Sequence, residues 1–147
     1  MVNHLPSMRL RRLRSSQVMR DLLQEHTVSV NDLIYPIFVE EDAVEFAPVE
    51  SMPGIFRIPE RKLDGAIKEI AAAGIKAVMT FGVSHRKDDI GSDAWNRDGL
   101  LARMIKRAKD AAPGLMVISD TCFCEYTSHG HCGVIHGNDV QDRKSVV

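Results

Sequence analysis

Three cysteines close together in the sequence are the residues best suited to chemistry. Cys122, Cys124 and Cys132 lie within eleven residues, spaced C-x-C-x7-C, and they are the only cysteines of the chain. In an extended chain Asp120 would share a face with Cys122 and Cys124, and nearby glycines allow the backbone to bring Cys132 back. Three soft thiolates within reach of one point suit Zn²⁺. We expect a metal site here, with small buried hydrophobic side chains or redox-active thiols as the alternatives.

The number of ligands separates a structural zinc site from a catalytic one. A structural site usually has four protein ligands, whereas a catalytic site has three and an open position. A fourth ligand is available in principle from His129, His131 or His136, although we expect each histidine to form an outer hydrogen bond or to be solvated. The spacing leaves the closed and the open site as equal alternatives.

The charge of such a site constrains its chemistry. Three thiolates leave a net charge of about −1 on Zn²⁺, so the ion acidifies a bound water less than one held by neutral imidazoles. It is better suited to orienting a substrate carbonyl or amine. Asp120 supplies a nearby carboxylate for proton transfer, with a capping role as the alternative.

The cysteine segment follows the last of three apolar runs that alternate with helical patterns. The expected strands cover residues 33–39, 77–81 and 115–119. The expected helices run from Pro59 to a stop at Gly74 and from a cap at Ser92 or Asp93 to Pro113, and residues 40–58 are expected to form a long loop. This β-α-β-α-β order predicts parallel strands in an α/β fold, either doubly wound or a (β/α)8 barrel. Sites in such folds collect at the carboxyl ends of strands, where the cysteine segment begins.

The composition is that of a globular domain. Of 147 residues, 44% are hydrophobic and 27% are charged, and no apolar run approaches the ~20 residues of a membrane-spanning helix. The charges nearly balance, with 19 basic and 20 acidic residues, and aromatic residues make up 5%. We therefore expect neither a nucleic-acid nor a membrane partner. The odd cysteine count and the lack of an apolar leader indicate reduced thiols in the cytoplasm.

Arginines are concentrated at the start of the chain. Five of them, from Arg9 to Arg20, precede the first acidic residue, Asp21. The alternatives are a mitochondrial presequence, a nucleic-acid-binding arm and an extended arm that packs on another surface. We expect the third for residues 1–30, because a short helical pattern follows the arginines. Its apolar members are Val18, Met19, Leu22 and Leu23.

The segment Asp120-Thr-Cys-Phe-Cys-Glu-Tyr-Thr-Ser-His-Gly-His-Cys-Gly133 resembles the zinc segment of the δ-aminolevulinic acid dehydratase family, the porphobilinogen synthases. The resemblance runs from about Met8 to Asp139 and accommodates Pro36, a residue that otherwise argues against the first strand. Further similar stretches are 9–14, 31–40, 51–59, 79–82 and 91–95.

The resemblance implies a fold and an activity. It implies a (β/α)8 barrel whose N-terminal arm embraces a neighbouring subunit, usually in an octamer. It implies condensation of two 5-aminolevulinate molecules to porphobilinogen with loss of two waters, a step of haem biosynthesis. Cys122, Cys124 and Cys132 fall on the zinc ligands, which serve the second substrate molecule, and Asp120 falls on an active-site aspartate. Any Mg²⁺ site of the family would lie in a segment that this chain lacks.

The chain departs from the family in its lysines and its length. The family uses lysines that form Schiff bases with the substrate ketone, and such lysines must be desolvated. None of the seven lysines here matches one of them: Lys62, Lys68, Lys76, Lys87, Lys106, Lys109 and Lys144.

Residues 31–141 supply about three of the eight βα units, after an arm over residues 1–30, and residues 142–147 do not resemble the family. We expect a truncated or frameshifted product, or a fragment, that is an incomplete TIM barrel and inactive alone. The alternatives are a non-catalytic zinc-binding remnant and a fragment that only joins intact subunits.

Overall fold

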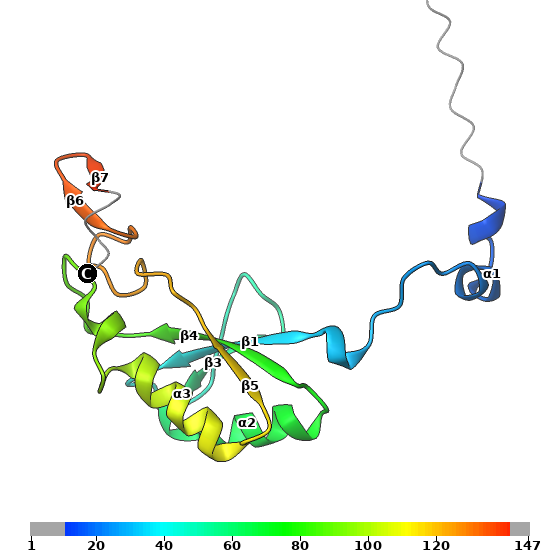
Figure 1. Ribbon diagram of the computed structural model, residues 1–147, viewed down its shortest axis with the longest axis horizontal. Helices are drawn as coiled ribbons and strands as arrows, with labels where there is room; N and C mark the ends of the chain where they lie inside the picture. The colour runs from blue at the N-terminus through cyan, green and yellow to red at the C-terminus, as the bar shows by residue number, and fades with distance from the viewer. Residues whose placement is uncertain (1–10, 142–147) are drawn as a thin grey trace, which may run out of the picture.

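The computed structural model describes residues 11–141, and its centre is a five-stranded sheet. The strands are β1 (Ile34–Glu40), β2 (Ala47–Pro48), β3 (Phe56–Pro59), β4 (Ala77–Val83) and β5 (Met116–Ser119). Their order is β2-β3-β1-β4-β5, with β1 parallel to β3 and β4, β4 parallel to β5, and only β2 antiparallel to its neighbour. The carboxyl ends of β1, β4 and β5 therefore meet at one edge, from which the cysteine segment leaves (Figure 1).

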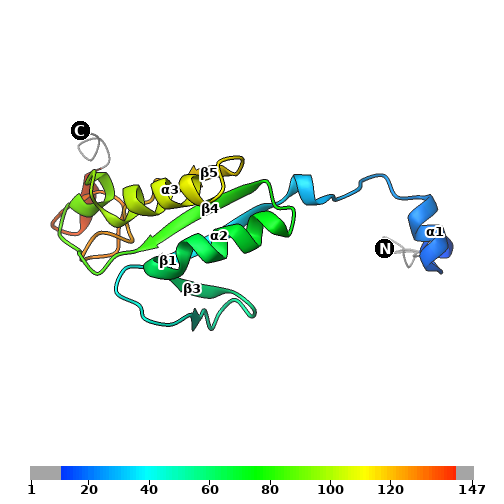
Figure 2. The same ribbon diagram turned by 90° about the horizontal axis from the view of Figure 1, so that it is seen from below.

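Two helices cover one face of this sheet, as Figures 1 and 2 show: α2 (Leu63–Ala72) and α3 (Leu100–Ala111). Each helix buries apolar residues at helical spacing, and these side chains meet alternate residues of the central strands. The buried core consists of Ile37, Val39, Ile58, Leu63, Ile67, Val78, Leu100, Met104, Ala108 and Leu115. The α/β class and the parallel strands predicted from the sequence are confirmed.

The opposite face of the sheet carries the other set of alternating side chains. Phe38 on β1 and Phe81 on β4 are register partners, and their rings stack with centroids 5.1 Å apart. Both residues are only half-buried, because no helix of the described chain covers this face.

Pro36 is compatible with β1 for a reason visible in the register. β1 pairs with β4 along its whole length, but its pairing with β3 begins only at Phe38. On the β3 side, Pro36 therefore lies where no ladder hydrogen bond is needed, and its missing N–H costs nothing.

Two expectations about the connections are wrong. Residues 40–58 are not one long loop, because β2 and most of β3 lie within them. The helix expected from Pro59 begins with a 3₁₀ turn, η3 (Glu60–Lys62), and becomes α-helical at Leu63.

The expected helix cap at Ser92 or Asp93 is also wrong. Residues Ser92–Trp95 form a 3₁₀ turn, η4, and α3 starts only after Gly99. Asp93 is buried and accepts a hydrogen bond from the Ser84 hydroxyl at 2.8 Å, so it is used by the preceding loop and is not a cap of α3.

Two parts lie outside the main sheet. A hairpin of β6 (Val134–His136) and β7 (Asp139–Gln141) follows the cysteine segment, and the sequence did not predict it. At the other end, η1 (Arg12–Arg14), α1 (Gln17–Leu22) and η2 (Val30–Asp32) precede the sheet, with α1 well away from it in Figure 1. None of the described helices is long and apolar enough to cross a membrane.

Candidate metal centre

The three thiols meet at the carboxyl edge of the sheet. Cys122 Sγ lies 2.7 Å from Cys124 Sγ and 3.2 Å from Cys132 Sγ, and all three sulfurs lie within 4.8 Å of one another. Cys122 and Cys124 are half-buried, Cys132 is exposed, and none forms a disulfide. Three sulfurs this close, open to solvent on one side, can bind one metal ion together.

The chain brings the sulfurs together by turning, not by continuing the strand. The last sheet-like contact is the Asp120 N–H, which donates to the Thr80 carbonyl at 3.3 Å. The chain then folds over Phe123, whose carbonyl accepts from the N–H groups of Tyr126 and Thr127 at 2.9 and 3.1 Å. Gly133, directly after Cys132, has φ +124°, a conformation that favours glycine. The predicted return of Cys132 is confirmed, whereas the extended path that would align Asp120 with the first two cysteines stops at Ser119.

Proton sharing among the thiols indicates what a metal ion would displace. Hydrogen bonds to Cys124 and Cys132 raise the pKa of Cys122 to about 12, and the bond from Cys122 lowers the pKa of Cys132. A metal ion bound here would displace the thiol protons, because thiolates and not thiols ligate metals. The donor set fits a soft or borderline divalent ion such as Zn²⁺.

Two buried residues anchor the cysteine segment to the sheet. Tyr126 and Thr127 are 3% and 2% exposed. The Tyr126 hydroxyl lies over Gly82 of β4, so close that a Cβ at position 82 would be 2.5 Å from it. Burial raises the pKa of Tyr126, so its hydroxyl stays protonated at neutral pH.

The three histidines proposed as a fourth ligand are not gathered with the sulfurs. Among residues 11–141, the cysteines alone form a group able to hold a metal ion. Both ring nitrogens of His129 are engaged: Nε2 lies 3.0 Å from the Asp89 carbonyl, and Nδ1 accepts from the His131 N–H at 3.2 Å. This pattern fits a neutral ring with its proton on Nε2. His131 and His136 are exposed.

Comparison with known proteins gives this site its family. The family model for delta-aminolevulinic acid dehydratase matches residues 7–147. The chain belongs to the delta-aminolevulinic acid dehydratase family. It is 57% identical over 133 residues to the dehydratase of Escherichia coli K12, covering 89% of this chain and 41% of that protein. It is 46% identical over 140 residues to the Staphylococcus aureus dehydratase, covering 94% and 43%.

A solved dehydratase shares the fold. The enzyme from Toxoplasma gondii, crystallised with its reaction product porphobilinogen, superposes with a TM-score of 0.75 at 34% identity. The superposition covers 94% of this chain and 38% of the other. The chain thus spans about two fifths of the length of the curated relatives that it matches. Dehydratases of this family depend on a metal, and the three cysteines are close enough to hold one.

The cysteine segment of this dehydratase chain also carries two carboxylates, Asp120 and Glu125. Asp120 is half-buried at the end of β5. Burial raises the pKa of Glu125, and the negative charge of Asp120 raises it further. Asp120 and Glu125 are therefore close enough to influence each other's charge, as in a site that carries protons.

None of the described lysines is buried as a Schiff-base lysine would be. Of the described lysines, Lys62 is half-buried and pairs with Glu45, and the others are exposed. The exposed ones are Lys68, Lys76, Lys87, Lys106 and Lys109. Lys144, like the predicted tail 142–147 and the start of the predicted arm, lies outside the described residues.

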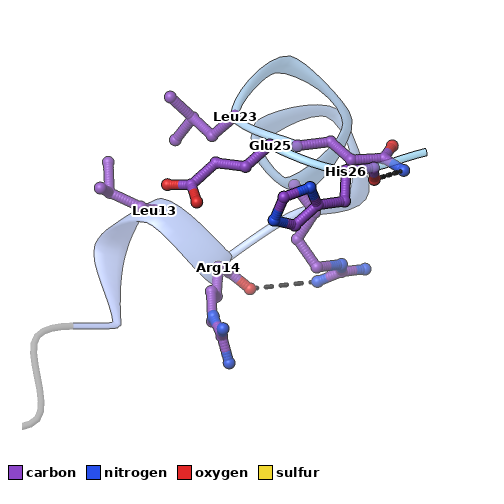
Figure 3. Close-up of a pocket in the computed structure, with 7 residues that line it drawn as sticks. Leu13, Arg14, Leu23, Glu25 and His26 are labelled. Carbon is purple, nitrogen blue, oxygen red and sulfur yellow. Dashed lines mark hydrogen bonds between the residues drawn. The ribbon is translucent and has the colours of Figure 1, made fainter.

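A hollow of about 630 Å³ lies in the N-terminal segment and not at the cysteines. It is framed by η1 and the residues around α1, with Leu13, Arg14, Leu23, Glu25 and His26 around it (Figure 3). The Arg20 guanidinium donates to the Arg14 carbonyl at 3.0 Å across it. The hollow contains no group of metal ligands.

Sequence reasoning missed the loop that supports the cysteines. Residues 84–93 contact the segment through Asp88, Asp89 and Gly91, none of which was singled out for the site. The only available signal was the similarity of residues 91–95 to the family, because contacts made across forty residues leave no local pattern.

Proposed function

We propose that this chain carries the metal-binding part of a porphobilinogen synthase, the activity that condenses two 5-aminolevulinate molecules and releases two waters. The observation that carries the proposal is the meeting of three thiols at the carboxyl edge of a parallel sheet, in a chain of the dehydratase family. The product held by the Toxoplasma gondii relative supports the same substrate class.

Cys122, Cys124 and Cys132 are proposed as the ligands of one Zn²⁺, with a fourth position open to substrate. The exclusion of His129, whose ring nitrogens are both engaged, supports an open site over a closed one. Zn²⁺ held there would act as a Lewis acid for the carbonyl or amine of the second substrate. The chain's own contribution is to hold three thiolates in place and to keep one side accessible, at exposed Cys132.

Asp120 is proposed as the group that moves protons at this site. It lies two residues before the first ligand, and its charge acts on Glu125. Burial raises the pKa of Glu125, which makes this carboxyl a second candidate proton carrier in the segment.

We propose that residues 31–141 correspond to about three βα units of a barrel and residues 1–30 to an arm that packs on another subunit. Exposed apolar side chains on and near α1, with Val18 74% and Leu22 76% exposed, support the arm. The uncovered face bearing Phe38 and Phe81 and the free edge of β5 support the missing barrel strands. A homo-octamer and a cytoplasmic location belong to the same proposal, the latter supported by three free thiols.

A second candidate is a non-catalytic zinc-binding or subunit-joining fragment. The exposure of the lysines favours it for this chain acting alone, because a Schiff-base lysine needs a desolvated site. The two candidates differ in one expectation. Joined to barrel strands that carry suitable lysines, a synthase segment forms porphobilinogen and a non-catalytic fragment does not.

A chimera separates them. In it, residues 7–139 replace the matching part of the Escherichia coli dehydratase, a protein 57% identical to this chain over 133 residues. We expect zinc-dependent formation of porphobilinogen from 5-aminolevulinate, and loss of it in the same chimera with Cys124→Ser. A chimera that melts cooperatively and binds zinc but makes no porphobilinogen would contradict the proposed activity and favour the fragment.

A further inference from the structure

Cys132 needs an external support. It lies ten residues after Cys122 and outside the five-stranded sheet, so the strand that delivers the first two cysteines does not hold it. Cys132 and the two residues before it, Gly130 and His131, are exposed. The contacts that fix its position come from the loop after β4, residues 84–91.

The peptide groups of Asp88 hold Thr127 from both sides. The Asp88 N–H donates to the Tyr126 carbonyl at 3.3 Å, and the Ser128 N–H donates to the Asp88 carbonyl at 2.8 Å. This is a parallel bridge between Asp88 and Thr127. The bridge fixes a residue that is 2% exposed in the middle of the cysteine segment.

From Thr127 the support reaches the residue next to Cys132. The Thr127 hydroxyl donates to the His131 carbonyl at 3.0 Å. The His131 N–H donates to His129 Nδ1 at 3.2 Å, while His129 Nε2 donates to the Asp89 carbonyl at 3.0 Å. Both peptide groups of His131 are thus tied back to the loop, and the direction in which the chain enters Cys132 is set by them.

The carboxylate of Asp88 gives the loop this shape. Its Oδ1 accepts from the N–H groups of Ile90 and Ser92 at 3.1 and 2.9 Å, and the Ser92 hydroxyl donates to Oδ2. The turn continues through Gly91 at φ +67°, where a Cβ would lie 3.2 Å from Thr127 Cγ2. The carboxylate therefore closes a turn that lets the loop approach the cysteine segment closely.

We propose that Asp88 is a positioning residue of the metal centre: its carboxylate shapes the loop whose backbone holds Cys132 beside Cys122 and Cys124. The inference rests on the metal site proposed above. Asp88 acts without ligating, since its oxygens are used within the loop and the group of metal ligands contains cysteines only. Outer partners of this kind alter metal affinity by about 10–100-fold.

Cobalt binding to the full chain tests the role with an optical readout. Thiolate-to-cobalt absorption reports how many thiolates ligate Co²⁺, and Cys132→Ser supplies the two-thiolate reference. We expect Asp88→Ala to weaken Co²⁺ binding about 10-fold and to shift the saturated spectrum toward that reference. Asp88→Asn keeps the Oδ1 acceptor and should restore both affinity and spectrum.

Asp89→Ala is the matched control, because it removes the same charge one residue away and retains the carbonyl that His129 uses. It should match the wild type. An Asp88→Ala chain with wild-type affinity and spectrum would overturn the positioning role, as would an Asp88→Asn chain as impaired as Asp88→Ala, since charge and not turn geometry would then be the cause. A wild-type chain without thiolate-to-cobalt absorption would instead refute the metal site itself, and the positioning role with it.

Discussion

At the residue scale, protons and a metal ion compete for the same three thiols. Cys122 lies within hydrogen-bond distance of both other thiols, so the three sulfurs are organised around one shared position. Binding of a metal ion would displace the thiol protons from this position, with little rearrangement of the chain. This pre-organisation is what the anchors Tyr126 and Thr127 provide, because both are buried beneath the segment.

Replacing one thiol tests this arrangement. Cys124→Ser should weaken zinc binding by at least about 100-fold, because loss of a ligand exceeds the effect of losing an outer partner. Competition with a zinc-binding dye measures the affinity. Ser128→Ala, an exposed neighbour, serves as the control and should leave affinity unchanged. Equal affinities in the two variants would mean that the cysteines are not the site.

The residues of the centre were predictable in part. Cys122, Cys124 and Cys132 are recognisable because metal ligands of one type at short spacing converge whenever a turn is available. The support from Asp88 was not, because its carboxylate shapes a turn whose backbone then bonds to Tyr126 and Ser128, about forty residues away in the sequence. Asp120 remains a prediction, since its position beside the segment does not show what its carboxylate does.

At the element scale, β4 and the cysteine segment are joined through Gly82. Gly82→Ala should destabilise the chain by about 1–3 kcal/mol, because the new Cβ would lie 2.5 Å from the Tyr126 hydroxyl and the ring must move. Urea unfolding measures the loss, and Tyr126→Phe in the same chain should recover part of it by removing the hydroxyl.

Gly65→Ala provides the matched control for this substitution. Position 65 lies in α2 with nothing within 4 Å of an added Cβ, so alanine there should stabilise by up to about 1 kcal/mol. A Gly82→Ala chain as stable as the wild type would show that Tyr126 does not anchor the segment on β4.

Arg103 on α3 forms ion pairs with Glu41 and Glu60, and their contribution to stability should depend on pH. Arg103 on α3 binds Glu60 through two hydrogen bonds of 2.8 Å and also Glu41 at 2.9 Å. The hydrogen bond from Arg103 lowers the pKa of Glu60 below its ordinary 4.5. A carboxylate with a lowered folded-state pKa stabilises the fold above the unfolded pKa, and this stability is lost as pH falls through the folded value.

Glu60→Gln should therefore lower the free energy of unfolding by about 1 kcal/mol at pH 7, a value kept small by the partial exposure of Arg103. This loss of stability should shrink below about pH 4. Urea unfolding at both pH values measures it. Asp110→Asn, which removes an exposed pair with Lys106, should have little effect. A cost for Glu60→Gln that grew on acidification would contradict the assigned sign.

The elements show where sequence patterns suffice. β4 and α2 were predicted within a few residues, because a continuous apolar run and a helical apolar face each encode their own burial. β3 and the β6–β7 hairpin were missed, since strands of four and three residues form only because a partner strand is present. The false cap at Asp93 arose because its side chain serves Ser84 and not a helix end.

At the scale of the whole molecule, the sheet is open on one face and has two edge strands, β2 and β5. Phe38 and Phe81 stack on a face without a helix, and β5 has a neighbour only in β4. The uncovered face and the free edge agree with a chain that covers about two fifths of its curated relatives. In the proposed barrel, further strands would pair with β5 and enclose this face.

The chain, prepared alone, should form no porphobilinogen. The reason is that zinc ligands are present but no described lysine suits a Schiff base: Lys62 is half-buried and paired with Glu45, and the others are exposed. A colorimetric assay with 5-aminolevulinate and zinc measures the product. Turnover that persists after removal of contaminating dehydratase, and that is lost on borohydride trapping, would overturn this expectation.

The most direct test of the account is zinc K-edge X-ray absorption on the zinc-loaded chain, because the central claim is that three thiols hold one ion at an open site. The account predicts one zinc per chain, coordinated by three sulfurs and one light atom without imidazole scattering. Fewer than three sulfurs, or a fourth protein ligand from histidine or from a second chain, would contradict it.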